Sequence, residues 1–261
     1  MIKGAPMTDV FDLTGRRALV TGGCRGIGAA IATAFAKRGA EVLVHGRGDE
    51  KSRVFAAEHG FSLLQADFNQ LDQVHAMVVD LISAGRPLDI LVNNAGMEVN
   101  ATVEHLDPEA LSRQLRINLE APILLTHGLI PLLKRSSHAS IINITSIHAS
   151  VPAYANAVYC AAKAGIEQFT NTLAIELGPA GVRVNSIAPG AVSTDMNREL
   201  LDHIGRELFA EWIPLGRLGE VADIAGPAVF LASDASSYVT AATLVVDGAY
   251  SHNVVRYHSA K

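Results

Sequence analysis

A glycine-rich turn, Thr21-Gly22-Gly23-Cys24-Arg25-Gly26-Ile27-Gly28, follows a short strand-like run at 17–20 and opens directly into an alanine-rich run at 27–38. The first run has the length of a buried strand, and the second has the length and spacing of a helix. Glycine permits a tight turn and lets the main chain approach a bound group closely. The free N–H groups at the start of the helix then attract an anion. This strand, turn and helix therefore predict a binding site for a pyrophosphate group.

Strand-like and helix-like runs alternate outward from this unit along nearly the whole chain. Further strands are predicted over 41–45, 89–93, 140–144, 183–187 and 242–246. Helices are predicted over 27–38, 74–82, 108–133, 156–177 and 221–231. Because parallel strands need helical crossovers, this alternation predicts an α/β fold with a parallel sheet covered on both faces. Pro122 lies inside the longest helical run, so we expect a kink or a break near it.

No linker, repeat or low-complexity segment divides the 261 residues, which indicates one domain. We place this domain at 14–250, after an N-terminal extension at 1–13 and before a C-terminal tail at 251–261. The extension lacks the apolar centre of a signal peptide. No apolar run reaches the roughly 18 residues of a membrane helix, so no membrane association is expected.

Composition excludes several kinds of partner. The net charge is -5 and the isoelectric point is near 6.0, which leaves no basic surplus for nucleic acid. Cys24 and Cys160 lack the spacing of metal ligands, and we expect them to be reduced thiols of a cytoplasmic protein. The ten histidines show no paired metal-binding spacing either, so no metal site is predicted.

The glycine spacing G-x-x-x-G-x-G resembles the fingerprint of the short-chain dehydrogenase/reductase family. Further segments match the family's turn after the fourth strand, its adenine-facing acidic residue and its nicotinamide-holding segment: Asn93-Asn94-Ala95-Gly96, Asp67, and Pro189-Gly190 with Val192 and Thr194. Together with 214–248, the similarity covers about 14–250. It implies a doubly wound, Rossmann-type sheet of seven parallel strands, and an enzyme that transfers a hydride between a nicotinamide cofactor and an alcohol or carbonyl.

The turn and these segments supply the expected contacts with the cofactor. The contacts are Gly22, Cys24, Arg25, Gly26, Ile27, Gly28, Arg47, Asp67, Phe68, Asn94, Ala95, Gly96, Tyr159, Lys163, Pro189, Gly190, Val192 and Thr194. The resemblance also implies that residues 191–214 form a lid over the substrate.

The end of the second strand predicts which cofactor is preferred. An acidic residue there binds the adenosine ribose and repels a 2′-phosphate. Gly46 occupies this position, Arg47 follows it, and Arg25 lies in the glycine-rich turn. Because guanidinium groups form paired, charge-assisted bonds with phosphate oxygens, we expect NADP(H) to be preferred over NAD.

A tyrosine and a lysine on one helix carry the predicted chemistry. Tyr159 and Lys163 are four positions apart, so their side chains share one helix face. A phenol titrates near pH ~10, and we expect the ammonium to lower the pKa of Tyr159. Ser146 lies beyond the strand ending at 144, where its hydroxyl can polarise a carbonyl. The resemblance adds Asn118 as a fourth catalytic residue in a proton path, and implies that Lys163 also contacts the nicotinamide ribose.

The substrate is less closely defined. Five residues are candidate substrate contacts: Glu98, His148, Asn156, Met196 and Trp212. The first three supply donors and acceptors for hydroxyl groups, which favours a sugar or polyol dehydrogenase. The alternative is a 3-oxoacyl-acyl-carrier-protein reductase or a general ketone reductase.

Two hypotheses lie outside active enzymes. A catalytically dead redox sensor would bind a dinucleotide but should lack Tyr159 or Lys163, and both are present. The other hypothesis is a scaffold protein. The family resemblance implies a homo-oligomer, either a dimer or a tetramer.

Overall fold

The computed structural model describes residues 9–197 and 202–253. Parts of three predicted segments lie outside these residues: 1–8 of the extension, 198–201 of the lid and 254–261 of the tail. The described end of the extension packs against the domain, because Leu13 is fully buried and the Val10 carbonyl accepts a hydrogen bond from the Ala235 amide.

The described residues form one sheet of seven strands in the order β3-β2-β1-β4-β5-β6-β7. Its strands are β1 (Arg17–Val20), β2 (Glu41–Gly46), β3 (Ser62–Gln65), β4 (Ile90–Asn93), β5 (Ser140–Ile144), β6 (Arg183–Pro189) and β7 (Thr243–Val246). All neighbouring pairs are parallel, which confirms the predicted doubly wound sheet. The direction of winding reverses between β1 and β4, and ligands of such sheets bind at this point.

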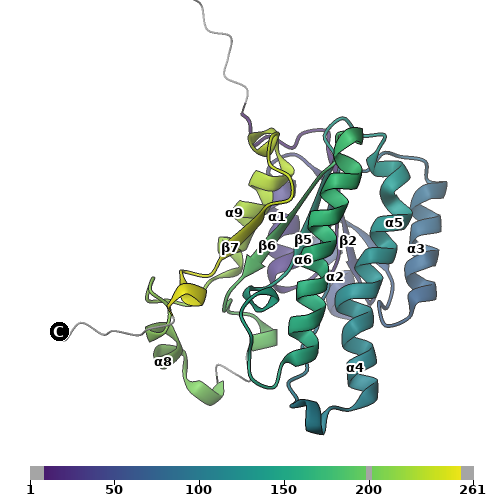
Figure 1. Ribbon diagram of the computed structural model, residues 1–261. Coiled ribbons are helices and arrows are strands. Elements are labelled where there is room, and N and C mark those ends of the chain that lie inside the picture. Colours follow the sequence, from purple (N-terminus) through teal and green to yellow (C-terminus); the bar gives the residue numbers. More distant parts are fainter. Residues whose placement is uncertain (1–8, 198–201, 254–261) are drawn as a thin grey trace, which may run out of the picture.

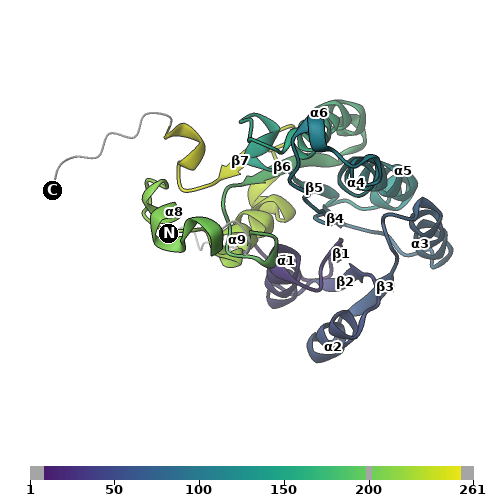
Figure 2. The ribbon, with the colours of Figure 1, turned by 90° about the horizontal axis from the view of Figure 1, so that it is seen from below.

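Helices cover both faces of the sheet (Figures 1 and 2). They are α1 (Gly26–Lys37), α2 (Glu50–His59), α3 (Leu71–Ser83), α4 (Pro108–Leu115), α5 (Ala121–Leu133), α6 (Ala157–Leu177), α8 (Arg206–Glu211) and α9 (Val221–Ala232). One apolar core lies between the sheet and α3, α5 and α6, and a second lies between the sheet and α1 and α9. Within the described part of the chain, no helix is long and apolar enough to cross a membrane.

The long helix predicted over 108–133 is interrupted, as expected from Pro122. A π-helical turn over 116–120 separates α4 from α5, and Pro122 lies in the first turn of α5. Proline has no N–H, and its ring presses on the carbonyl four residues earlier, here that of Asn118. The interruption therefore surrounds a predicted catalytic residue, and π-helical turns are frequent at functional sites.

Helix α2 was not predicted from the sequence. It buries only Ser52 and Ala56, so it carries no apolar stripe that periodicity could reveal. Its ends are stabilised locally: the Asp49 side chain accepts a hydrogen bond from the Ser52 amide at 2.8 Å, and Gly60 follows it in a left-handed conformation.

Candidate active site

The loops that follow β1 and β4 are joined at the point where the winding reverses. The Thr21 hydroxyl accepts hydrogen bonds from the Asn94 and Ala95 amides at 2.9 and 3.0 Å. In return, the Asn94 side-chain amide donates to the Thr21 carbonyl at 2.9 Å. Two segments that lie far apart in the sequence are therefore joined at this end of the sheet.

The glycine-rich turn has the shape needed for a diphosphate. Gly22 and Gly26 have φ angles of +60° and +54°, which side-chain-bearing residues rarely adopt. A Cβ on Gly28 would lie 2.3 Å from the Gly22 carbonyl oxygen, so only glycine fits there. Arg25, at the N-cap of α1, provides no side-chain cap, which leaves the first N–H groups of the helix available to an anion. The residues present thus fit the pyrophosphate of a nicotinamide dinucleotide.

A buried histidine that no sequence pattern indicated holds this turn in place. His45, at the end of β2, is 4% exposed, and its Nδ1 accepts a hydrogen bond from the Gly22 amide at 3.2 Å. Its Nε2 must then carry the proton, which it donates to the Ala66 carbonyl at 3.0 Å. The ring stacks on Phe68 with centroids 4.0 Å apart. The only signal in the sequence was a lone polar residue ending a strand beside the glycine-rich turn.

Burial lowers the pKa of His45 to about 4, which keeps the ring neutral and able to make both bonds. In the unfolded chain the pKa returns to about 6.5, so the unfolded state binds a proton first as the pH falls. The stabilisation is therefore complete above pH ~6.5 and is lost towards pH ~4. We expect this loss to reach about 3 kcal/mol in the free energy of unfolding.

The variant His45→Gln tests this linkage. We expect it to unfold more easily than the wild type at pH 7 and to lose less stability between pH 7 and pH 4.5. Urea unfolding at the two pH values measures both effects. His59→Gln is the matched control, because His59 is exposed and its contacts are local: a hydrogen bond with the Phe55 carbonyl and ring contacts with Phe55 and Phe61. An equal loss of stability in His45→Gln and the wild type would contradict the role of His45.

The predicted catalytic residues converge at the carboxyl end of β5. Ser146 lies just beyond this strand, and its hydroxyl accepts a hydrogen bond from the His148 amide at 3.1 Å. Tyr159 and Lys163 lie one turn apart on α6, are 8% and 6% exposed, and the Lys163 Nζ is 5.6 Å from the centre of the tyrosine ring. The same Nζ donates to the Ile144 carbonyl at 2.9 Å, which ties α6 to the end of the strand.

The pKa values of this pair differ from the sequence-based expectation. Burial raises the pKa of Tyr159 well above its usual value, the charge of Glu98 adds to this rise, and a hydrogen bond with Ser146 opposes it. Burial lowers the pKa of Lys163 to about 8, against the opposing effect of Glu98. The prediction that Lys163 brings down the tyrosine pKa was therefore wrong for this structure, in which desolvation dominates. Tyr159 is held in its protonated form.

Asn118 connects the π-helical turn to the loop after β4. Its Oδ1 accepts from the Met97 amide at 3.0 Å, and its Nδ2 donates to the Met97 carbonyl at 2.7 Å. A Cβ on Gly96 would lie 2.9 Å from Asn118 Oδ1 and 3.7 Å from Lys163 Nζ, so the three residues are close together. The structure thus brings the predicted fourth residue next to the lysine.

A carboxylate that no sequence pattern indicated, that of Asp49, lies beside the two predicted phosphate-binding arginines. Hydrogen bonds from Ser52 hold the pKa of Asp49 below its usual range, and the charges of Arg47 and Arg25 contribute to this effect. Asp49 therefore lies near both exposed arginines. Its Oδ1 also caps α2, and the lowered pKa keeps the carboxylate charged, so two guanidinium groups face one negative charge at this edge.

Other predicted cofactor residues lie in the loops after β3 and β6. The Asp67 carboxylate accepts a hydrogen bond from the Asn69 amide, and the Phe68 side chain is buried behind His45. Gly190 and Val192 follow β6, and Val192 is only 2% exposed. Thr194 faces the glycine-rich turn, because its methyl group lies 3.8 Å from the position of a Cβ on Gly26.

Three of the predicted substrate residues cluster around Ser146 and Tyr159. The Asn156 side-chain amide donates to Glu98, whose charge acts on Tyr159. The His148 Nδ1 bonds the Val151 carbonyl at 2.9 Å. The two others belong to the segment after β6: Met196 is 47% exposed, and the Trp212 ring lies 5.3 Å from that of Phe209.

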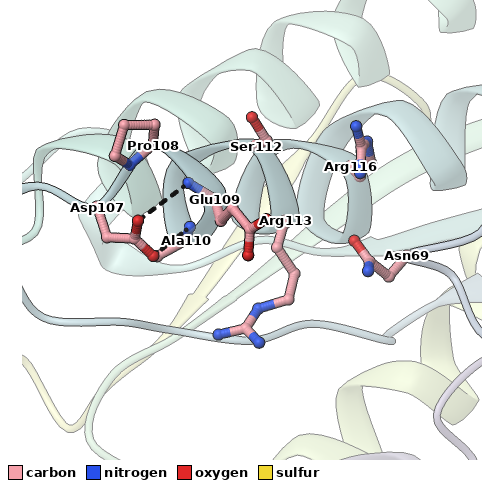
Figure 3. A pocket seen from close by; sticks show the side chains of 8 residues that line it. All are labelled: Asn69, Asp107, Pro108, Glu109, Ala110, Ser112, Arg113 and Arg116. Carbon is pink, nitrogen blue, oxygen red and sulfur yellow. Dashed lines mark hydrogen bonds between the residues drawn. The ribbon is translucent and has the colours of Figure 1, made fainter.

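A separate hollow of about 410 Å³ lies over α4 (Figure 3). It is lined by Asn69, Asp107, Pro108, Glu109, Ala110, Ser112, Arg113 and Arg116. The Asp107 carboxylate there caps α4 by accepting hydrogen bonds from the Glu109 and Ala110 amides. The hollow adjoins the site only through Asn69, whose amide donates to Asp67.

Known proteins share this arrangement. A family model described as "Enoyl-(Acyl carrier protein) reductase" matches residues 22–251. The 3-oxoacyl-acyl-carrier-protein reductase FabG of Chlamydia trachomatis serovar D is 38% identical over 243 residues, which are 90% of this chain and 97% of the relative. The chain belongs to the short-chain dehydrogenase/reductase family. As a member of this family, it is an NAD(P)-dependent oxidoreductase acting on alcohol and carbonyl groups.

Sugar-acting family members are similarly close. The gluconate 5-dehydrogenase of Gluconobacter oxydans strain 621H is 34% identical over 252 residues, which are 92% of this chain and 96% of the relative. The crystal structure of a gluconate 5-dehydrogenase from Burkholderia cenocepacia J2315 in complex with NADP and tartrate has a TM-score of 0.87 and 32% identity. That match covers 94% of this chain and 98% of the other.

Proposed function

We propose that this short-chain dehydrogenase/reductase interconverts a sugar or polyol with the corresponding carbonyl compound and prefers NADP(H). The observation that carries the proposal is the hydrogen-bonded pair of Glu98 and Asn156 beside Tyr159. Such polar groups pair with substrate hydroxyls and are left unpaired by a substrate that lacks them. The similarity to two gluconate 5-dehydrogenases, one of them in complex with NADP and tartrate, supports the same substrate class.

In the reducing direction, Tyr159 donates its phenolic proton to the substrate carbonyl oxygen. Its raised pKa keeps that proton in place until negative charge develops on the oxygen. The Ser146 hydroxyl donates a hydrogen bond to the same oxygen and polarises the carbonyl. Lys163 sits beneath the tyrosine ring and supports the proton transfer. The nicotinamide, when bound, supplies or accepts the hydride.

Arg47 and Arg25 support the preference for NADP(H). Both are exposed beside the glycine-rich turn, where a 2′-phosphate would lie. At the position where an acidic residue would select NAD, a Cβ on Gly46 would lie 2.9 Å from the Ser52 hydroxyl oxygen. A larger side chain at that position therefore requires Ser52 to move.

The variant Arg47→Ile tests the preference. A hydrogen bond to a charged group contributes roughly 1.5–3 kcal/mol, so we expect kcat/KM for NADPH to fall about 10- to 150-fold. The value for NADH should change little. Arg135→Ile is the control, since Arg135 is exposed just after the end of α5, beside the start of β4 and away from the carboxyl ends of the strands. A wild-type ratio of NADPH to NADH efficiencies below one would refute the preference.

A second candidate function is the reduction of 3-oxoacyl thioesters, which the similarity to FabG favours. A carrier-protein reductase favours a basic docking patch near the site, and the segment 191–214 contains only two cationic residues, Arg198 and Arg206. A panel of gluconate, aldoses, polyols and an acetoacetyl thioester, measured with both cofactors, tests the two functions. We expect a polyhydroxylated substrate to have the highest kcat/KM. A thioester ahead of every sugar by tenfold would reverse the order, and NADPH binding without any turnover would indicate a sensor.

We also propose a cytoplasmic homo-oligomer. Cys24 and Cys160 are both free thiols, as expected in a reducing compartment. Ile175 on α6 is 77% exposed and Val245 on the edge strand β7 is 48% exposed, which favours self-association. Light scattering after size-exclusion chromatography measures the state, and a mass of one chain would refute the proposal.

A further inference from the structure

The carboxylate of Asp49 is fixed in place beside the two predicted phosphate-binding arginines. Asp49 is the N-cap of α2, and its Oδ1 accepts hydrogen bonds from the Ser52 amide at 2.8 Å and from the Ser52 hydroxyl at 2.6 Å. Both bonds use the same oxygen, so the carboxylate is anchored while the side chain stays exposed. This fixed negative charge has a role in capping, and its place in the fold gives it a second one.

The residue that anchors Asp49 also packs against the position that reads the ribose. Ser52 is 6% exposed, and its hydroxyl oxygen lies 2.9 Å from where a Cβ on Gly46 would be. The Cys24 sulfur lies 3.1 Å from the same point, which connects this position to the glycine-rich turn. An acidic residue in place of Gly46 would bind the ribose 2′-hydroxyl and repel a 2′-phosphate. The chain lacks that residue and instead holds a carboxylate on the other side of the Ser52 hydroxyl.

The charge of Asp49 acts on the groups expected to bind the phosphate. Arg47 lies two positions before Asp49, and the charges of Arg47 and Arg25 both act on its carboxylate. The charge of Asp49 also acts on the Cys24 thiol in the glycine-rich turn. Among the residues that the structure describes, however, no ion pair joins Asp49 to either arginine. Because Ser52 anchors the carboxylate, both guanidinium groups remain available to a phosphate.

We propose that Asp49 limits the preference for NADP(H), because its carboxylate opposes the 2′-phosphate that Arg25 and Arg47 bind. A phosphate monoester carries a charge of about −1.5 to −2 at pH 7, so a fixed carboxylate nearby weakens its binding. NAD(H) has no charge at this position and is not opposed. Ser52 is a positioning residue for the carboxylate. The inference rests on the proposed preference and deepens it: the enzyme prefers NADP(H) and still uses NAD(H).

The test removes the charge of Asp49 and keeps its cap. Asp49→Asn does so, since asparagine is as good an N-cap as aspartate. The probes are adenosine 2′,5′-bisphosphate and AMP, which differ only in the 2′-phosphate and need no substrate. At about 20 mM salt, we expect the affinity of Asp49→Asn for the bisphosphate to exceed that of the wild type about 3- to 10-fold. The affinity for AMP should change less than about twofold. Isothermal titration calorimetry measures both. The ratio of kcat/KM for NADPH to kcat/KM for NADH should rise by the same factor as the bisphosphate affinity.

Two comparisons separate the charge of Asp49 from its capping role. Glu50→Gln removes an equal charge from the next, exposed residue of α2, and it should change the affinity for the bisphosphate less than about twofold. At about 500 mM salt, the gain in Asp49→Asn should also fall below about twofold, because salt screens exposed charges. A change in the shape of α2 would persist at high salt. Asp49→Ser, which also caps a helix, provides the same test if asparagine perturbs the fold.

Any of three outcomes overturns the inference: an affinity of Asp49→Asn for the bisphosphate that is no higher than that of the wild type, an equal gain in Glu50→Gln, or a gain that salt does not reduce. The two probes also distinguish this failure from that of the proposed preference. If the wild type binds the bisphosphate no more tightly than AMP and Asp49→Asn does, the preference fails and the role of Asp49 stands. If the wild type binds the bisphosphate more tightly and Asp49→Asn only equals it, the reverse holds.

Discussion

Replacing Tyr159 by phenylalanine should lower the turnover number about 10²- to 10⁴-fold, the usual contribution of general acid–base catalysis. The change removes only the phenolic oxygen. Tyr159 is almost fully buried and its ring lies over Lys163, so phenylalanine keeps the packing of α6. Stopped-flow or steady-state rates with the best substrate of the panel measure the loss.

The binding of the cofactor separates this effect from a folding defect. We expect Tyr159→Phe to quench NADPH fluorescence with nearly the wild-type dissociation constant. Tyr238→Phe is the control, because Tyr238 is fully exposed and should tolerate the change without loss. Residual activity above about one tenth of the wild type in Tyr159→Phe would refute its assignment as the acid.

The architecture was predictable because strands and helices alternate with clear periods. The strands around the crevice are buried on both faces, so they appear as short apolar runs such as 90–93 and 140–144. The break near Pro122 followed from proline's missing donor, although no local pattern indicated that it would take the form of a π-helical turn around Asn118. Helix α2 escaped prediction because polar capping, and not an apolar stripe, holds it in place.

The site was predictable where motifs mark it and not where burial decides it. The glycine-rich turn is recognisable from its place between a strand and a helix. Tyr159 and Lys163 are recognisable from their spacing together with Ser146 and the resemblance to the family. The role of His45 depends on a carbonyl and a ring contributed by 66–68, which no local pattern links to it. The raised pKa of Tyr159 was missed for the same reason, since desolvation is a property of the packed molecule.

Asp49 was not predicted as a neighbour of the two arginines, because the prediction considered only Gly46 and Arg47 at the end of β2. Its carboxylate lies near Arg25 and Arg47, yet it belongs to the cap of an unpredicted helix. Whether this carboxylate weakens the attraction for a 2′-phosphate is measurable. The ratio of kcat/KM for NADPH to kcat/KM for NADH, measured in the wild type and in Arg47→Ile, reports the effect of Arg47 on the cofactor preference with Asp49 in place.

Lys163→Met should reduce catalysis at least as strongly as Tyr159→Phe, by about 10⁴-fold, and should also weaken the binding of NADPH. Methionine fills a similar volume but removes the ammonium that we propose supports the proton transfer from Tyr159 and contacts the ribose of the cofactor. Loss of a hydrogen bond from a charged group is worth roughly 1.5–3 kcal/mol, so we expect the dissociation constant of NADPH to rise about 10- to 150-fold.

The double effect distinguishes Lys163 from Tyr159, whose replacement should leave cofactor binding intact. Lys163 Nζ also holds the Ile144 carbonyl at 2.9 Å, so thermal unfolding of each variant must be measured alongside. Lys51→Met is the control, because Lys51 is exposed on α2 and should affect neither rate nor binding. If Lys163→Met folds and binds NADPH with the wild-type constant, the lysine acts only on the proton transfer. Its second role at the ribose would then be wrong, and the anchoring of the cofactor would depend on the glycine-rich turn and the loop after β4.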